Sequence, residues 1–178
     1  ADPVAGAEAV TAWAADAGAP VRVARLGEVH RLGALTWQVV GPEPRYATGR
    51  AESAGSAANN ASVALLVESG GVRLLLAGDM EPEAQEAMRR ALPGLHVDVL
   101  KVPHHGSRHQ DPQFLTGLRP RLAVVSVGED NTYGHPAPET LALLEDHRVL
   151  VRRTDEDGDV AVVVRQGVLS VQVRPSGS

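Results

Sequence analysis

Residues 97–107 read Val-Asp-Val-Leu-Lys-Val-Pro-His-His-Gly-Ser, an apolar segment that ends in a cluster of polar side chains. Its first six residues are typical of a short, mostly buried strand. Two other segments have the same form: Val72–Ala77 precedes Gly78-Asp79, and Leu122–Val127 precedes Tyr133-Gly134-His135-Pro136. Because the loops beyond strand ends meet at one edge of the sheet in layered α/β folds, we expect these polar clusters to lie close together.

The remaining segments predict strands that alternate with helices. Helices are expected at residues 5–17, 82–91, 112–117 and 138–145, and further strands at 21–26, 35–40, 62–68, 149–153, 160–165 and 168–173. The stretch from Glu43 to Asn60 has few apolar anchors and is predicted to be a long loop. This order favours an α/β sandwich over a bundle or a barrel. The length of 178 residues suits a single domain over residues 1–178.

Composition restricts the chemistry that the chain can perform. Without cysteine, a transition metal must be held by imidazole and carboxylate groups. The net charge of −5 argues against broad, nonspecific nucleic-acid binding, although a local basic groove or bound cations would still hold phosphates. Lys101 is the sole lysine, and two residues separate it from the histidine pair. This placement is either chance or a requirement for an ammonium group there.

Asp79, His104, His105 and His135 are the candidate metal ligands, and each has a structural alternative. Asp79 also suits the N-cap of the helix that begins near Pro82. His104 and His105 are ligands or polar loop residues, and neighbouring side chains at a strand end point in opposite directions, so we do not expect both to bind one ion. His135 stands between Gly134 and Pro136, a stiff turn that would fix its ring for a structural or a ligand role.

Other polar positions carry weaker signals. Asn59 and Asn60 are typical turn residues before a strand. The acidic run 154–159 lacks the spacing of an EF-hand loop and is predicted to be a turn. The histidines outside the clusters, at positions 30, 96, 109 and 147, have no ligand spacing.

Taken in order, these motifs resemble the metallo-β-lactamase-like domain of ComEC-type competence proteins over about residues 20–173. The resemblance rests on Asn59-Asn60-Ala61-Ser62, Leu74–Glu81, Leu100–Ser107, Ser126–Pro136 and Arg153–Gly158. It implies an αββα sandwich in which Asp79 bridges two metal ions, one of His104 and His105 is a ligand, and His135 is the last histidine of the set. Asn59 or Asn60 then lies near the place of a metal-binding histidine in many relatives.

One hallmark of that family is missing from the chain. The H-x-H-x-D-H motif, which supplies most of the metal ligands, occurs nowhere in the 178 residues. We therefore expect the chain to be a carboxy-terminal portion whose amino-terminal half of the sandwich is incomplete. Such a portion should bind metal weakly and hydrolyse little on its own, because a two-metal site needs ligands from both halves. Its exposed sheet edges would favour association with a partner or a second copy.

The resemblance implies a metal-dependent phosphodiester hydrolase, a nuclease that acts on DNA during uptake in natural transformation. The expected cofactors are two Zn²⁺ or Mn²⁺ ions, and the expected partner is a DNA single strand or duplex end. Asp79, His104, His135 and Lys101 are the expected catalytic residues, with Lys101 neutralising a phosphate. The expected location is the extracytoplasmic face of the bacterial membrane, reached through other segments of the parent protein. The alternatives are a lactonase or small phosphodiesterase of the same fold, and a metal-free module that guides or scaffolds DNA.

Overall fold

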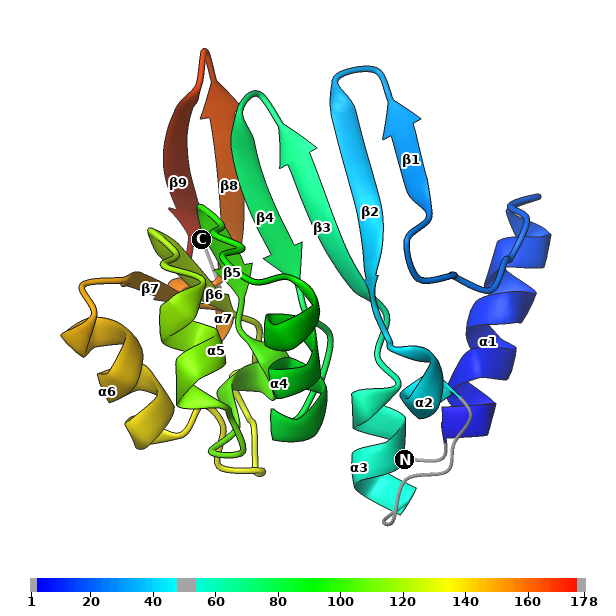
Figure 1. Cartoon of the computed structure of the whole chain (residues 1–178), viewed down its shortest axis with the longest axis horizontal. Coiled ribbons are helices and arrows are strands. Elements are labelled where there is room, and N and C mark those ends of the chain that lie inside the picture. Colours follow the sequence, from blue (N-terminus) through cyan, green and yellow to red (C-terminus); the bar gives the residue numbers. More distant parts are fainter. Residues whose placement is uncertain (1–2, 48–53, 176–178) are drawn as a thin grey trace.

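The computed structural model describes residues 3–47 and 54–175 and shows a mixed sheet flanked by helices (Figure 1). Within that part of the chain the main sheet has seven strands in sequence order: β1 (Val29–Leu32), β2 (Leu35–Gly41), β3 (Ala64–Ser69), β4 (Val72–Leu76), β5 (Val99–Lys101), β6 (Leu122–Val125) and β7 (Leu150–Arg153). Strands β1 to β4 pair antiparallel, whereas β4 to β7 are parallel. The carboxyl ends of four neighbouring strands therefore lie along one edge of the sheet.

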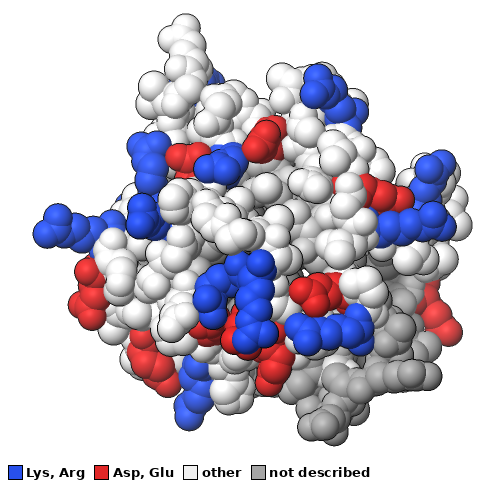
Figure 2. Space-filling view, in the orientation of Figure 1, with Lys and Arg blue, Asp and Glu red and all other residues white. Residues whose placement is uncertain are grey.

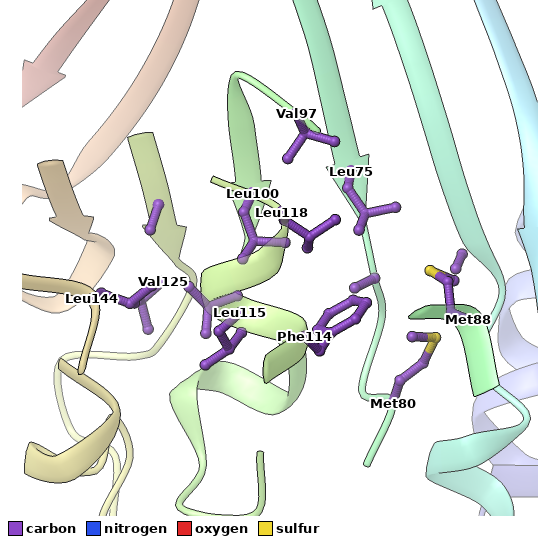
Figure 3. Close-up of a cluster of buried hydrophobic side chains, with 14 of the residues drawn as sticks. Leu75, Met80, Met88, Val97, Leu100, Phe114, Leu115, Leu118, Val125 and Leu144 are labelled. Carbon is purple, nitrogen blue, oxygen red and sulfur yellow. The ribbon is translucent and has the colours of Figure 1, made fainter. Parts of the chain in front are cut away.

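Helices α4 (Pro82–Ala91), α5 (Pro112–Gly117) and α6 (Pro138–Asp146) connect the parallel strands and cover one face of the sheet (Figure 1). The main core lies between them and the strands. Figure 3 shows Phe114 and Leu115 of α5 among side chains from the strands, including Leu75 and Leu100, and all four are at most 2% exposed. Burial of a side chain of this size stabilises the fold by about 1.5–3 kcal/mol.

The opposite face of the sheet carries a hairpin, β8 (Asp159–Arg165) paired with β9 (Val168–Arg174). Alternate residues of a strand point to opposite faces, so Val99 turns away from the helices while its neighbour Leu100 faces them. Val99 packs with Val164 and Leu169 of the hairpin in a second, smaller core. The described residues thus form three layers, which are helices, the large sheet and the hairpin. The α/β class predicted from the sequence is confirmed, and its metallo-β-lactamase-like form stays a prediction.

The amino-terminal region differs from the sequence prediction. Residues 21–26 form no strand, although their alternation predicted one, and strand β1 forms instead at Val29–Leu32. The turn at Gly33-Ala34 pairs Leu32 with Leu35, and Gly33 takes a φ of +60° there. The predicted helix is present as α1 (Pro3–Asp16), with Trp13 largely exposed.

The predicted long loop between Glu43 and Asn60 is also wrong in part. It contains α2 (Pro44–Ala47) and α3 (Ala54–Asn60), while residues 48–53 lie outside the described part of the chain. The predicted acidic turn contains a single helical turn, α7 (Thr154–Asp157). Among the described helices, none combines the length and the apolar character needed to cross a bilayer.

Candidate functional site

The three polar clusters meet at the carboxyl ends of β4, β5 and β6. A hollow of about 910 Å³ opens there, and all four candidate ligands line it. The lining residues are Asn59, Asp79, His104, His105, Val127, Gly128, Glu129, Asp130, Asn131, Tyr133 and His135. The parallel order of the strands explains the convergence, since loops that follow parallel strands leave the sheet at the same edge.

Asp79 leaves β4 in a tight turn and points its carboxylate toward this hollow. Its backbone N–H donates to Ser62 Oγ at 2.9 Å. At Gly78, where φ is +60°, a Cβ would lie 2.6 Å from Ser62 Cβ, so the close approach requires glycine. The N-cap of α4 is Glu81, so the capping alternative for Asp79 is wrong.

Lys101 supports the same turn. Its Nζ donates to the Gly78 carbonyl at 3.1 Å and lies 3.5 Å from Asp79 Oδ1. The side chain of Lys101 is 20% exposed, and it is not among the residues that line the hollow. The ammonium is therefore placed to orient Asp79, and its contact with a phosphate stays a prediction.

The ring of His105 has a defined tautomer. Its Nδ1 lies 2.6 Å from the carbonyl oxygen of Ser126, which only accepts hydrogen bonds, so Nδ1 carries the proton. In the neutral ring this leaves the Nε2 lone pair free, 3.7 Å from Asp79 Oδ2. A backbone carbonyl that fixes one ring nitrogen while the other faces the site is the usual support of a metal-binding histidine.

The rings of His104 and His135 contact each other edge to face beside the hollow. Their ring centroids are 5.4 Å apart at an interplanar angle of 67°. Among the described residues, the buried Nδ1 atoms of both rings have no hydrogen-bond partner, and the nearest carboxylate oxygen to His104 Nδ1, in Glu81, is 3.8 Å away. An unpaired buried polar atom costs about 1–3 kcal/mol, so two of them in residues that line one hollow need an explanation.

The environment of His135 favours its neutral form. Burial lowers the pKa of His135 below the ordinary value of 6.5, and the neighbouring His104 and His105 lower the pKa further. A neutral imidazole is the form that binds a metal ion. The shift therefore keeps His135 available as a ligand at a lower pH than an ordinary histidine.

The loop that carries the histidine pair has a strained backbone. His104, His105 and Gly106 have φ values of +48°, +53° and +74°, and the left-handed region costs about 1–2 kcal/mol for a residue with a side chain. Residues in such conformations persist when surrounding contacts hold them, and they cluster at functional sites. Here Gln110 Nε2 donates to the carbonyls of Pro103 and Ser107 at 3.0 and 3.1 Å.

A buried glutamine ties that loop to the helices. Gln85 of α4 is fully buried, and its Nε2 donates to Met80 O at 2.6 Å and to Gln110 Oε1 at 2.8 Å. Its Oε1 accepts from the backbone N–H of Asp111 at 2.7 Å. One side chain thus fixes the turn after β4, the histidine loop and the start of α5 relative to each other.

Glu81 is a site residue that sequence reasoning missed. Its side chain is 12% exposed and lies beside His104. Asn59 Nδ2 donates to Glu81 Oε1 at 2.7 Å, and the Glu81 backbone N–H donates to Asn60 Oδ1 at 3.0 Å. The asparagine pair, predicted to be turn residues, ends α3 and holds the entry to α4. The spacing of Asp79 and Glu81 in one short turn was the available signal.

The donor set is incomplete as it stands. Within the described residues, no three His, Asp or Glu side chains already converge closely enough to hold a metal ion. The hollow offers two pairs instead, His104 with His135 and Asp79 with His105. Figure 2 shows acidic and basic side chains intermingled on the face in view, without a continuous basic field there.

The fold and the hollow define an α/β protein with an imidazole- and carboxylate-lined site at the ends of its parallel strands. The chain is similar to ComE operon protein 3 of Bacillus subtilis, at 32% identity over 94% of this chain and 21% of that protein. It is also similar to Recombination protein 2 of Haemophilus influenzae, at 32% identity over 64% of this chain and 14% of that protein. Competence protein ComA of Neisseria gonorrhoeae is likewise 32% identical, over 64% of this chain and 17% of that protein. The chain therefore spans about a fifth or less of each of these relatives. No family model matches it.

Proposed function

We propose that this chain forms part of a metal-dependent phosphodiester hydrolase, a nuclease that acts on DNA during uptake in natural transformation. The observation that carries the proposal is the pair of buried, unpartnered Nδ1 atoms in His104 and His135, two residues that line one hollow together with Asp79 and His105. The name of one relative, Competence protein ComA, refers to competence and supports the DNA-uptake context. The metallo-β-lactamase type of sandwich is part of the same proposal.

The residues present fit part of a site for Zn²⁺ or Mn²⁺. Imidazole and carboxylate groups are the donors that such ions accept when thiolates are absent. His104 and His135 would supply two nitrogens, and Asp79 and His105 an oxygen and a further nitrogen. The remaining donors of a two-metal site would come from residues other than those described.

The chain's own groups have separate roles in this proposal. Bound divalent cations would supply Lewis acidity, which activates water and offsets phosphate charge. Asp79, held by Lys101 at 3.5 Å, presents a carboxylate oxygen to the hollow. The Ser126 carbonyl keeps the proton of His105 on Nδ1, which leaves the Nε2 lone pair free beside Asp79. The depressed pKa of His135 keeps that ring neutral.

The substrate and location complete the proposal. A DNA single strand or duplex end would enter the hollow, which is broad enough to admit part of a nucleotide. The extracytoplasmic face of the bacterial membrane is the proposed location, with membrane contact made through segments other than this chain. Because acidic and basic side chains are interspersed on the face seen in Figure 2, that face offers no broad basic surface for DNA.

Metal binding by this chain is the first test. Titration calorimetry with Zn²⁺ and Mn²⁺ should show weak, saturable binding, which Asp79→Ala and His135→Ala each weaken by tenfold or more, in line with the loss of a ligand. His96→Ala removes an exposed histidine outside the hollow and should leave binding unchanged. Equal binding by the His135→Ala and His96→Ala variants would contradict the proposed ligand set.

Cleavage of labelled single- and double-stranded DNA is the second test. We expect a rate near background from this chain alone, because its described ligand set is incomplete. In a longer protein that carries the remaining donors, cleavage should require metal and Asp79. Cleavage that persists in a chelator, or in the Asp79→Ala variant, would refute a metal-dependent nuclease. Metal content below about one ion per chain in that longer protein would favour a metal-free DNA-guiding module.

A further inference from the structure

Tyr133 stands exposed at the mouth of the hollow. Tyr133 is 85% exposed and is among the most exposed of the described large hydrophobic and aromatic residues. The ring nevertheless has a fixed neighbour, because it stacks against His135 at a centroid distance of 6.4 Å and an interplanar angle of 20°. A tyrosine placed flat against a candidate ligand, but left open to solvent, gains little from burial.

The loop places this ring through hydrogen bonds rather than through packing. Asn131 Oδ1 accepts from the Tyr133 backbone N–H at 2.8 Å, and Asn131 Nδ2 donates to the His135 carbonyl at 2.9 Å. The Asn131 N–H donates in turn to the Gly128 carbonyl at 3.1 Å. One side chain therefore holds both ends of the Tyr133–His135 segment, and the ring is positioned without being covered.

The charge of the same loop indicates what it contacts. Glu129 and Asp130 also line the hollow, so this wall repels phosphate groups. The ammonium of Lys101 and three of the candidate metal ligands, Asp79, His104 and His105, lie on the β4 and β5 side, whereas His135 shares the loop of Tyr133. A nucleotide in the hollow would accordingly place its phosphate toward Asp79 and its base toward Tyr133.

We propose that Tyr133 is a stacking platform for an unpaired nucleobase next to the phosphate in the hollow, so that the site takes single-stranded DNA or an unpaired end rather than continuous duplex. Within a duplex both faces of a base are covered by its neighbours, whereas an unpaired base offers a free face to an aromatic ring. This inference rests on the proposed function and specifies its substrate.

The test is the affinity of a fluorescein-labelled thymidine decamer, measured by anisotropy at low salt with Mn²⁺. Tyr133→Ala should weaken binding by about 5- to 160-fold, the range that base–aromatic stacking provides. Tyr133→Phe keeps the ring and should bind within about twofold of the wild type. Trp13→Ala removes another exposed aromatic, 68% exposed on α1, and is the matched control. A blunt duplex of the same length should bind more weakly and should not respond to Tyr133→Ala.

Three results would overturn the inference: no binding of the single strand, equal affinity of the Tyr133→Ala variant and the wild type, or an equal loss for single strand and duplex. An abasic decamer provides a second measurement, since it should bind the wild type as weakly as the normal decamer binds Tyr133→Ala. The stacking inference and the hydrolase proposal can fail independently of each other. The stacking inference fails if Tyr133→Ala leaves decamer binding unchanged, whereas the hydrolase proposal fails if Asp79→Ala leaves metal binding unchanged.

Discussion

Replacing Gly106 by alanine tests whether close packing of two loops holds the site together. Gly106 has a φ of +74°, and a Cβ there would lie 2.8 Å from Pro136 Cβ. Its carbonyl also accepts the Ala137 N–H at 2.8 Å, so the histidine loop and the His135 loop meet at this glycine. The left-handed backbone costs about 1–2 kcal/mol once a side chain is present. The overpacked contact adds about 1–3 kcal/mol, giving a predicted loss of about 2–5 kcal/mol.

Urea denaturation followed by circular dichroism measures that loss. Gly94→Ala is the matched control for backbone strain, because Gly94 has a φ of +75° but nothing within 4 Å of its Cβ position. It should cost only about 1–2 kcal/mol. Gly117→Ala, which has neither feature, should be neutral or stabilising by up to about 1 kcal/mol. If Gly106→Ala costs no more than Gly94→Ala, the two loops are not packed as the structure shows.

Three further predictions concern the charge, the core and the edges of the molecule. In a metal-free sample, NMR titration should give His135 a pKa below 6.5, because burial disfavours the imidazolium. The stability that this group contributes to the folded state is then present above pH 6.5 and is lost as the pH falls through the lowered pKa. A pKa at or above 6.5 would contradict the burial of His135. Gln85→Leu should lower the free energy of unfolding by about 1–3 kcal/mol in urea denaturation, because it leaves the Asp111 N–H without its acceptor. Gln113→Leu, on the exposed side of α5, should lower it little. Equal effects of the two substitutions would argue against the buried network. Sedimentation should show concentration-dependent self-association through edge strand β1. Leu32→Lys should reduce that association, since Leu32 is 71% exposed on this strand. A monomer at every concentration would rule out self-association.

The convergence of the candidate ligands was predictable because it depends on the order of the parallel strands more than on individual side-chain contacts. Asp79, His104 and His135 each follow an apolar strand, and parallel strands bring such loops to one edge. The choice for Asp79 between helix cap and site residue was not predictable, since aspartate suits both roles. The structure excludes the cap, because Glu81 is the N-cap of α4, and the role of Asp79 as a site residue stays a prediction.

Supporting contacts could not be predicted because they join residues far apart in the sequence. No local sequence pattern predicts the hydrogen bond between Gln85 and Gln110. Asn59 and Glu81, which are also hydrogen-bonded, are 22 positions apart in the sequence. The strand expected at residues 21–26 failed for a related reason. Alternation of apolar and polar residues creates a strand only when a partner edge is available, and β2 pairs with β1 and β3 instead.

The most direct test of the account is anomalous diffraction from crystals of this chain equilibrated with Zn²⁺ or Mn²⁺. A metal peak is expected inside the hollow, within bonding distance of at least one imidazole nitrogen of His104 or His135. That peak should be absent in the His135→Ala variant and retained in His96→Ala. A metal bound elsewhere, or a hollow in which both Nδ1 atoms find protein partners instead, would contradict the assignment of these histidines as ligands.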